Sequence, residues 1–397
     1  MIYLDNNATT KPLAEVMDAM RESLDSNWGN PSSVHRFGQA ARAAVEQARE
    51  HVAQLVGCSE REIIFCSSGT ESAALALRGV LQAHPKRRLI VTSKLEHAAV
   101  RNVVEHLGAA GMCEVIWVEH APSGEIHLEH LRSVVKKRAD EIALVSLMSV
   151  NNETGVILPV RLVGELCRES GVLFHSDATQ TVGRQPFDVA NASVDFATFS
   201  AHKLHGPKGA AALFARRGVG IVAQLVGGPQ ERDRRAGTEN VAGLIGFGVA
   251  AKAARAWLSS ADMNHSAELR NQLETLIHSA IPDAVINGFT AARVWNTTNI
   301  AFAHLEAEAI LLALSNEGVC ASAGAACSSG SLDPSPVLLA MGVSPVLAHG
   351  SVRLSLSRFT TRDDIARAAT IVCDCVRQLR ARTGAAVNTK RHLDTRT

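Results

Sequence analysis

The segment Ser200-Ala201-His202-Lys203-Leu204-His205-Gly206-Pro207-Lys208-Gly209 follows the motif Ser176-Asp177-Ala178-Thr179-Gln180 by about twenty residues. An apolar run typical of a buried strand precedes each motif. The carboxyl ends of neighbouring parallel strands meet at one edge of a sheet, and ligands collect there. We therefore expect Asp177 and Lys203 to lie close together at that edge.

A lysine and an aspartate in this arrangement match the chemistry of pyridoxal 5′-phosphate. The lysine binds the aldehyde of this cofactor covalently, and the aspartate keeps the pyridine nitrogen protonated so that the ring can accept electrons. Lys203 has two competing interpretations: it is a surface lysine, or Lys208 takes its role. Ser200 and His202 can donate hydrogen bonds to a phosphate, whereas Lys208 falls inside a Pro-Lys-Gly turn. The sequence therefore favours Lys203.

Asp177 has a second interpretation as the N-cap of a helix, which is common for an aspartate after a strand. An N-cap role does not explain the polar residues around it, which are His175, Ser176, Thr179 and Gln180. A pairing with the pyridine nitrogen remains the favoured interpretation.

The segment Glu62–Ser72 predicts a strand, a turn of small residues and the start of a helix. Free backbone N–H groups at a helix N-terminus bind phosphate, and a glycine lets the phosphate approach closely. A Ser-Gly-Thr sequence before a helix is more often only a cap. Beside a candidate cofactor lysine, it indicates a phosphate site.

Helical and strand-like segments alternate from about residue 12 to residue 258. Short β-rich runs recur at Glu62–Cys66, Leu89–Thr92, Val115–Val118, Ile142–Val150, Val172–His175 and Phe196–Phe199. This alternation predicts an α/β fold with a largely parallel sheet that is covered on both faces. The predicted domains are a large cofactor-binding domain (12–258) and a smaller α+β domain (1–11 and 259–380) that carries the Cys327 segment. The polar, aperiodic tail 381–397 is expected to be loosely ordered.

The composition gives no sign of a nucleic-acid or membrane ligand. The 40 Lys and Arg residues nearly balance 39 Asp and Glu residues, which leaves a formal charge of +1 and no strong attraction to polyanions. The longest nearly apolar run, Val241–Ala251, ends at Lys252 and is shorter than the roughly 20 residues that cross a bilayer. Small molecules and other proteins are the expected partners.

The eight cysteines are scattered without a Cys-x-x-Cys pair, which argues against a disulfide scaffold and against a zinc site; no metal is expected. The start of the chain, Met1–Asn7, lacks the basic segment and apolar core of a secretion signal. We therefore expect the protein in the reducing cytoplasm.

Cys327 lies in Ala321–Ser331, a run of small residues. Most cysteines are small buried hydrophobes. Here no regular element is expected and the backbone has much freedom, which suits a nucleophile that must move toward a substrate and away again.

The segment Ser351–Arg358 alternates with period two and places Arg353 opposite the apolar side chains. One interpretation is a half-exposed strand with a solvated arginine. The other is that the guanidinium of Arg353 binds the α-carboxylate of an amino-acid substrate.

Taken together, these residues closely resemble the class I cysteine desulfurases, of the nitrogen-fixation and housekeeping iron–sulfur type. The similarity runs from Tyr3 to about Arg380. Its motifs are Tyr3–Thr10, Gly29–His35, Gly69–Ser72, Glu96-His97, Asn151–Gly155, Asp177–Gln180, His202-Lys203, Arg235–Asn240 and the Cys327 segment. The amino-acid sequences of three of these motifs are most similar to the nitrogen-fixation branch: Asn151–Gly155, Lys203–His205 and Gly237–Asn240. Alanines at 73, 74 and 201, and in Ala-Gly-Ala-Ala-Cys, depart from the usual pattern without removing a required chemical group.

The resemblance implies the fold type I of the pyridoxal-phosphate-dependent transferases and a homodimer with active sites near the subunit interface. It implies catalytic roles for Cys327 as persulfide-forming nucleophile, Lys203 as cofactor lysine and proton carrier, and His97, which would stack on the ring. Arg353 and Asn152 would bind the substrate, and Gln180 would bind the phenolic oxygen of the cofactor. The implied cofactor-binding residues are Lys203, Asp177, Gln180, Asn152, His97, Gly69, Thr70, Ser200, His202 and, from the other subunit, Thr238.

The implied activity converts L-cysteine to L-alanine and leaves a persulfide on Cys327. An acceptor or scaffold protein would take this sulfur for iron–sulfur cluster assembly, with nitrogenase as one destination. One alternative is an aminotransferase, or a lyase acting on selenocysteine or a related amino acid, in which Cys327 is dispensable. Another is a non-catalytic scaffold for sulfur acceptors, which predicts damage at Lys203 or Cys327; both residues are intact.

Overall fold

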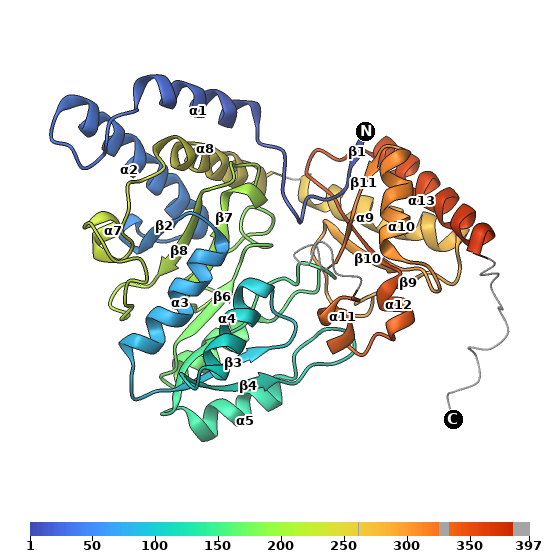
Figure 1. The fold of residues 1–397 in the computed structure, drawn as a ribbon, viewed down its shortest axis with the longest axis horizontal. Coiled ribbons are helices and arrows are strands. Elements are labelled where there is room, and N and C mark those ends of the chain that lie inside the picture. The colour runs from blue at the N-terminus through green and yellow to red at the C-terminus, as the bar shows by residue number, and fades with distance from the viewer. Residues whose placement is uncertain (261, 325–332, 384–397) are drawn as a thin grey trace.

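The computed structural model describes residues 1–260, 262–324 and 333–383. A large sheet within residues 63–215 and a smaller one within residues 285–355 lie side by side, each with its own helices (Figure 1).

The large sheet has seven strands in the order β2-β8-β7-β6-β5-β3-β4. Neighbouring strands are parallel except at β8, which is antiparallel to both β2 and β7. The strands are β2 (Ile63–Cys66), β3 (Leu89–Ser93), β4 (Glu114–Val118), β5 (Ile142–Ser146), β6 (Phe174–Asp177), β7 (Phe196–Ser200) and β8 (Ala211–Ala215). The predicted α/β class with a mostly parallel sheet is confirmed.

Two strand predictions were incomplete. β8 was missed because its sequence, Ala-Ala-Leu-Phe-Ala, contains no β-branched residue. The run Ile142–Val150 was taken as one strand, but β5 ends at Ser146, and Val150 instead forms an isolated antiparallel bridge with Ile157. The apolar residues after Ser146 are therefore a buried loop at the sheet edge where the site lies.

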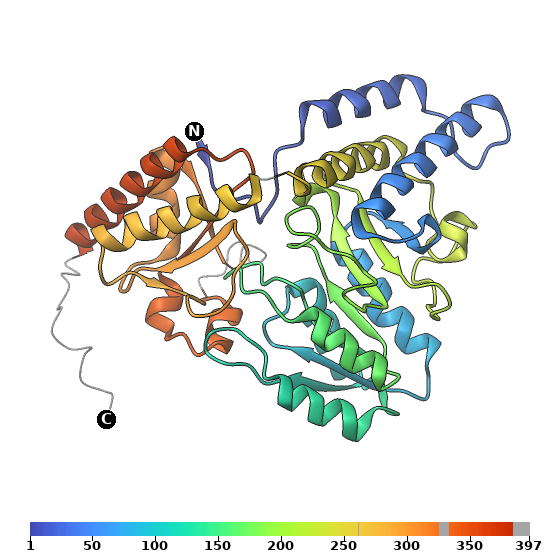
Figure 2. The ribbon, with the colours of Figure 1, turned by 180° about the vertical axis from the view of Figure 1, so that it is seen from behind.

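Helices cover both faces of the large sheet (Figures 1 and 2). Apolar side chains of α3 and α4 pack on one face, and those of α1, α2, α5, α6 and α8 form the core on the other. These helices are α1 (Ala14–Ser26), α2 (Arg36–Val56), α3 (Gly69–Ala83), α4 (Ala98–Ala109), α5 (Leu128–Arg138), α6 (Val160–Glu169) and α8 (Val241–Leu258). Short helical turns are η1 (Glu60–Glu62), η2 (Ala201–Lys203) and α7 (Gln230–Asp233).

Helix α8 is longer than the apolar run that the sequence showed, and its 18 residues are apolar enough to pass as a membrane span. Half of this segment is buried inside the structure. Leu244, Phe247 and Ala251 belong to the core of the large sheet, so packing inside the fold accounts for the apolar character of α8.

The smaller part is built on an antiparallel sheet in the order β12-β13-β10-β9 and on a parallel pair, β1 with β11. Its core is a separate apolar cluster. The strands are β1 (Ile2–Tyr3), β9 (Val285–Ile286), β10 (Thr297–Ala301), β11 (Val319–Cys320), β12 (Ser322–Ala323) and β13 (Ser351–Ser355). The helices are α9 (Asp262–Ala280), α10 (Ala307–Asn316), α11 (Pro336–Ala340), α12 (Pro345–His349) and α13 (Arg362–Thr383).

The first ten residues run from the smaller part to the larger one (Figures 1 and 2). β1 pairs with β11, and Asp5 forms a bridge with Ser355 at the end of β13. The Thr10 N–H then donates to the His202 carbonyl at 2.9 Å. This N-terminal segment, residues 1–10, therefore passes directly over the sheet edge that the sequence singled out.

Candidate active site

Asp177 and Lys203 lie at one edge of the large sheet. β6 and β7 run parallel, and Asp177 is in register with Thr198. β7 ends at Ser200, and the turn η2 then carries Lys203. The topology therefore brings the two predicted residues to neighbouring strand ends.

The amine of Lys203 is held by the N-terminal segment. Its Nζ donates to the carbonyl of Asn7 at 2.5 Å and to that of Ala8 at 2.8 Å. Lys203 is half-buried, whereas Lys208 is exposed. This difference favours Lys203 over its competitor, because a half-buried amine lies inside a site rather than in solvent.

Asp177 is buried, and its Oδ1 accepts a hydrogen bond from the Thr179 N–H at 2.9 Å. No helix begins after it; residues 179–181 form turns. The helix N-cap interpretation is therefore wrong, and Asp177 caps a turn with one carboxylate oxygen.

His175 lies on the same strand as Asp177 and is fully buried. Its two ring nitrogens contact the hydroxyls of Ser146 at 2.8 Å and Thr198 at 3.0 Å. Burial lowers the pKa of His175 to about 4, although the nearby charge of Asp177 opposes the shift. A neutral His175 leaves the negative charge of Asp177 without a cationic neighbour on its own strand.

The N-terminus of α3 faces Ser200. Ser68 caps the helix by accepting a hydrogen bond from the Glu71 N–H at 3.1 Å. Gly69 is the first helical residue, and a Cβ added there would lie 2.8 Å from Ser200 Oγ. The space between the helix end and this hydroxyl is therefore kept open by a glycine, with Thr70 exposed beside it.

His202 lies next to this cradle and contacts the N-terminal segment. Its Nδ1 lies 3.2 Å from Thr9 Oγ1. Burial, together with the positive charge of Lys203, lowers the pKa of His202 to about 4. A phosphate at this place would meet a neutral imidazole, which acts as a hydrogen-bond donor and not as a countercharge.

Thr238 is exposed on the loop after α7. Arg235 of the same loop pairs with Glu71 of α3 at 2.7 Å, so the loop lies beside α3 of its own chain. Within the described residues, no backbone hydrogen bond joins Thr238 to the other predicted cofactor residues.

Arg353 is almost completely buried on β13, with 2% of its surface exposed. Its guanidinium donates to the Asn152 carbonyl and to Asp5 Oδ1, both at 3.0 Å. The interpretation as a half-exposed strand is therefore wrong, because β13 lies between β12 and β10 and both of its faces are covered.

Two polar atoms here are buried without a hydrogen-bond partner among the described residues: Arg353 Nε and Asn152 Oδ1. One is a donor and the other an acceptor. Buried polar groups are normally paired, so both atoms fit a site that is completed by a bound polar group.

His97 and Gln180 are also positioned by backbone contacts. His97 is the N-cap of α4, where its Nδ1 accepts from the Ala99 N–H at 3.1 Å. Gln180 is buried; its Nε2 donates to the Asn7 carbonyl at 3.2 Å, and its Oε1 accepts from Arg184.

Arg184 contacts Gln180 and was missed in the sequence. In a polar turn, the sequence does not distinguish a buried arginine from an arginine exposed to solvent. Only the sequence spacing of four residues from Gln180 is a signal, and it is a weak one.

Cys327 lies outside the described residues. The described residues on either side of it, Gly324 and Ser335, both contact the buried carboxylate of Glu153. Ser335 Oγ donates to Glu153 Oε2 at 2.5 Å, and a Cβ on Gly324 would lie 2.3 Å from the same oxygen. Glu153 directly follows Asn152, so described residues on both sides of the cysteine segment contact the loop that carries Asn152.

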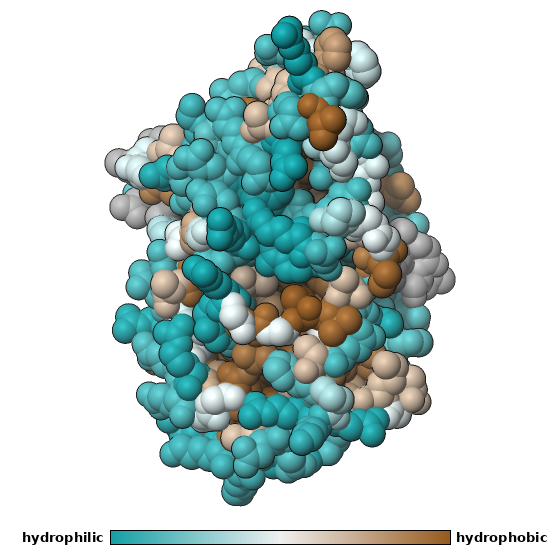
Figure 3. All heavy atoms as spheres, turned by 90° about the vertical axis from the view of Figure 1, so that its left-hand side faces the viewer, coloured by the Kyte–Doolittle hydropathy of each residue, from teal (hydrophilic) through white to brown (hydrophobic). Residues whose placement is uncertain are grey.

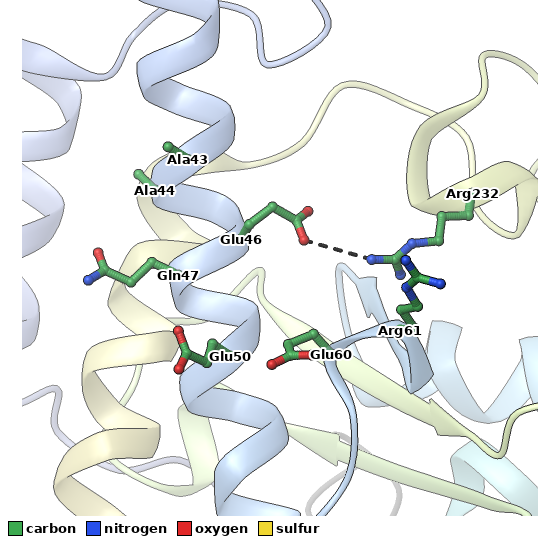
Figure 4. A pocket seen from close by; sticks show the side chains of 8 residues that line it. All are labelled: Ala43, Ala44, Glu46, Gln47, Glu50, Glu60, Arg61 and Arg232. Carbon is green, nitrogen blue, oxygen red and sulfur yellow. Dashed lines mark ion pairs between the residues drawn. The ribbon is translucent and has the colours of Figure 1, made fainter.

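A separate surface hollow lies between α2 and the loops of η1 and α7 (Figure 4). Charged side chains line it, and Glu46 and Arg232 form an ion pair across it at 3.7 Å. Its charged lining is typical of a solvated surface. None of the predicted site residues lines this hollow.

Comparisons with known proteins identify the family of this chain. The family described as aminotransferase class-V matches residues 2–368. "Cysteine desulfurase 2" of Trichormus variabilis is 47% identical over 381 residues, which cover 96% of this chain and 94% of the relative. The chain belongs to the cysteine desulfurase family. "Cysteine desulfurase NifS" of Azotobacter vinelandii is 43% identical, with 96% and 93% of the two chains covered.

A solved structure named "NIFS-LIKE PROTEIN" has a TM-score of 0.87 and 34% identity, and the match covers 95% of this chain and all of that one. The family resemblance and the transferase fold that the sequence predicted are confirmed. Cysteine desulfurases are pyridoxal-phosphate-dependent enzymes, so the predicted cofactor is confirmed as well.

The residues at the sheet edge fit this cofactor. Lys203 supplies an amine, Asp177 a carboxylate, and Gly69 an open cradle at a helix N-terminus. The unpartnered Asn152 Oδ1 supplies a buried polar atom for a ligand.

Proposed function

We propose that this enzyme converts L-cysteine to L-alanine and carries the released sulfur as a persulfide on Cys327. One observation supports this most strongly: Lys203 and Arg353 meet on the same N-terminal segment. Lys203 donates to the Asn7 carbonyl, and Arg353 pairs with Asp5. A cofactor lysine and a carboxylate-binding arginine on one short segment would form a site for a small amino acid.

The α-carboxylate of the substrate would bind at Arg353. Its guanidinium already contacts Asp5 and the Asn152 carbonyl, while its Nε–H is left for a further acceptor. Asn152 Oδ1, which has no hydrogen-bond partner among the described residues, belongs to the same residue as the carbonyl that Arg353 contacts. Because an arginine fork matches a carboxylate geometrically, this pair would fix the orientation of the amino acid.

Pyridoxal phosphate, when bound, supplies an electron sink that stabilises negative charge at the substrate Cα. Asp177 would hold a proton at the pyridine nitrogen. Lys203 would leave the carbonyls of Asn7 and Ala8 and remove the Cα proton, and His97 would cover the ring.

Gly69, Thr70, Ser200 and His202 would bind the phosphate of the cofactor. The helix N-terminus offers N–H groups, and the neutral His202 offers one more donor. Thr238 would add a hydroxyl from the other subunit. Asn152 and Gln180 would lie near the phenolic oxygen.

Cys327, as a thiolate, would attack the sulfur of the substrate. An S–S bond forms to Cys327 as the Cβ–S bond of cysteine breaks. The electron pair of the broken bond stays with Cβ, which takes up a proton and becomes the methyl group of alanine. The balance needs no outside oxidant, because the two electrons that the sulfur gives up on entering the persulfide reduce Cβ.

A homodimer is part of the proposal. Large apolar side chains are exposed on the single chain, among them Trp28, Phe37, Leu225 and Val226. Apolar residues gather in the middle of the face seen in Figure 3. Exposed patches of this kind are typical of protein interfaces.

The sulfur would pass to an acceptor or scaffold protein for iron–sulfur cluster assembly in the cytoplasm. The name NifS of the Azotobacter relative supports nitrogenase as one destination. A scattered charge of both signs and a net charge of +1 agree with protein and small-molecule partners.

The test compares wild type, Cys327→Ala and the control Cys58→Ala, with L-cysteine and a thiol reductant. Alanine and sulfide are measured together. Burial raises the pKa of the Cys58 thiol, so this control removes a cysteine that is a poor nucleophile.

Equal amounts of alanine and sulfide are expected from wild type and from Cys58→Ala. A loss of more than about 100-fold is expected in Cys327→Ala, because the nucleophile is gone. Undiminished alanine formation by Cys327→Ala would instead indicate a lyase, and a need for a 2-oxo acid would indicate an aminotransferase.

A further inference from the structure

Arg184 is buried behind the candidate cofactor site, with 4% of its surface exposed. Its Nη1 donates to Asn7 Oδ1 at 2.7 Å and to the side-chain oxygen of Gln180. Its Nη2 donates to the carbonyls of Asn6 at 2.8 Å and Lys203 at 3.3 Å. One guanidinium thus joins the N-terminal segment, the turn after β6 and the backbone of the cofactor lysine.

All of these acceptors are neutral. Among residues 1–260, 262–324 and 333–383, no carboxylate lies within ion-pair distance of Arg184. Buried charges in proteins are normally paired, because removal from water is costly. Burial, and the nearby positive charge of Arg353, lower the pKa of Arg184 to about 9, so the side chain is still protonated at pH 7.

The contact with Arg184 fixes the orientation of the Gln180 amide. The oxygen of this amide accepts from Arg184, and one N–H of its nitrogen donates to the Asn7 carbonyl. An amide has one oxygen and two N–H donors. With the oxygen engaged, Gln180 can present only an N–H to a ligand.

We propose that Arg184 is a positioning residue for the cofactor, which turns the Gln180 N–H toward the phenolic oxygen and favours the anionic form of that oxygen by its charge. The inference rests on the proposed binding of pyridoxal phosphate at Lys203. An uncompensated cation behind an N–H donor is the electrostatic arrangement that an anionic oxygen requires.

The charged and titratable groups that face this place come from several elements. They are Arg353 on β13, Lys203 and His202 on η2, His205 after η2, Asp5 across Arg353, and Asp177 at the end of β6. Asp5 is paired with Arg353, and both histidines are neutral because burial lowers the pKa of each to about 4. Substituting Arg184 therefore removes one positive charge from the site without breaking the Asp5–Arg353 ion pair.

A purely structural role is the competing explanation. The Trp295 Nε1–H donates to the Arg184 carbonyl at 2.8 Å, so the backbone at this position joins the two parts of the molecule. That contact involves no side-chain atom of Arg184, so substitutions of the side chain leave it in place.

The experiment compares wild type with Arg184→Gln and Arg184→Lys, each loaded with pyridoxal phosphate. Arg358→Gln is the matched control, since burial also lowers the pKa of Arg358 and its guanidinium contacts a backbone carbonyl, that of Ala253. Two quantities are measured: the pH midpoint of the absorption change of the bound cofactor, and the cofactor concentration that half-saturates the protein.

Removing a positive charge makes it easier to protonate the cofactor. Arg184→Gln should therefore raise the absorption midpoint by about one pH unit. Arg184→Lys keeps the positive charge but loses the planar guanidinium with its several N–H donors. The pH midpoint of the absorption change should therefore equal that of wild type, while the half-saturating cofactor concentration rises at least about threefold. Arg358→Gln should match wild type in both quantities.

An unchanged midpoint in Arg184→Gln would overturn the proposal, and so would wild-type cofactor affinity in Arg184→Lys. If Arg184→Gln does not fold, Arg184→Lys alone decides. The two proposals fail differently: a wild-type protein that titrates normally but forms no alanine refutes the desulfurase reaction and leaves the role of Arg184 intact.

Discussion

Glu96 precedes His97, and its carboxyl group is completely buried. Its Oε1 accepts from the Met148 N–H at 2.6 Å, and its Oε2 has no hydrogen-bond partner among the described residues. Burial raises the pKa of Glu96 well above its usual value, which favours the neutral acid in the folded protein. The contact ties the His97 loop to the chain that leads to Asn152.

A neutral buried acid makes stability depend on pH in a defined direction. The stabilisation from Glu96 is complete below its unfolded pKa, near 4.3, and is lost as the pH rises toward the raised pKa of the folded state. Glu96→Gln keeps the acceptor and removes the titration. We expect the free energy of unfolding of wild type to fall relative to Glu96→Gln between pH 5 and pH 8, by up to about 1.4 kcal/mol per pH unit.

Denaturant unfolding of the cofactor-free proteins at four pH values measures this difference. Glu308→Gln, at an exposed position of α10, serves as the control and should follow wild type. Parallel curves for wild type and Glu96→Gln would show that Glu96 is ionised in the folded state.

Among the secondary-structure elements, the N-terminus of α3 shows how local capping contacts prepare a binding site. Ser68 caps the helix, Glu71 turns back to the Ser67 N–H at 2.9 Å, and Arg235 neutralises Glu71. With the carboxylate turned away and paired, the helix end at Gly69 keeps its attraction for an anion.

A methyl group at Gly69 should damage this cradle without unfolding the helix. The added Cβ would displace the Ser200 hydroxyl, 2.8 Å away, while alanine is a better helix former than glycine. For Gly69→Ala we expect unchanged thermal stability of the cofactor-free protein and about tenfold weaker binding of pyridoxal phosphate, or about 1.4 kcal/mol.

Absorbance titration with the cofactor measures this loss. The control is Gly220→Ala, whose added Cβ would meet only Ala83 and His84 at ordinary contact distances of 3.5 Å and 3.8 Å. Equal cofactor affinity of Gly69→Ala and wild type would place the phosphate elsewhere.

At the scale of the whole molecule, the N-terminal segment joins two separate cores. Asn7 donates to the Asn152 carbonyl at 3.0 Å and to Thr297 Oγ1 at 2.9 Å, and its own side-chain oxygen accepts from Arg184. Residues from both parts of the chain therefore meet on one asparagine. The site exists only when the two parts of the chain are assembled around this segment.

The dimer proposal assigns Thr238 to the site of the other subunit, and mixed subunits test it. A homodimer of Lys203→Ala chains would lack the cofactor lysine in both sites. A homodimer of Thr238→Val chains would lack the Thr238 hydroxyl in both sites. In a mixed dimer, one site would combine the intact Lys203 of one chain with the intact Thr238 of the other. Random mixing should restore roughly a quarter of the wild-type sites, because half of the dimers are mixed and each has one intact site.

Cofactor occupancy and alanine formation are measured before and after unfolding and refolding the two proteins together. Refolding them separately and then mixing them, without subunit exchange, is the control and should restore nothing. No recovery after joint refolding would show that Thr238 serves its own chain, beside the Arg235 and Glu71 contact.

Local sequence pattern was enough to predict strands β6 and β7 and the chemistry expected at their carboxyl ends. Apolar runs that end in polar motifs placed β6 and β7, and parallel strands necessarily bring Asp177 and Lys203 to one edge. Glycine before a helix placed the cradle at Gly69. These features depend on local pattern and on chain direction, which a sequence records directly.

The tertiary structure alone decided which polar groups are buried and what they contact. Arg353 lies on a strand whose alternation was compatible with a solvated face, until two neighbouring strands and a second layer covered it. Arg184 and Glu96 have no distinctive local pattern; their importance comes from burial between segments far apart in the chain. Burial depends on the packing of the whole chain, so charge state and hydrogen-bond partners follow from the fold and not from the motif.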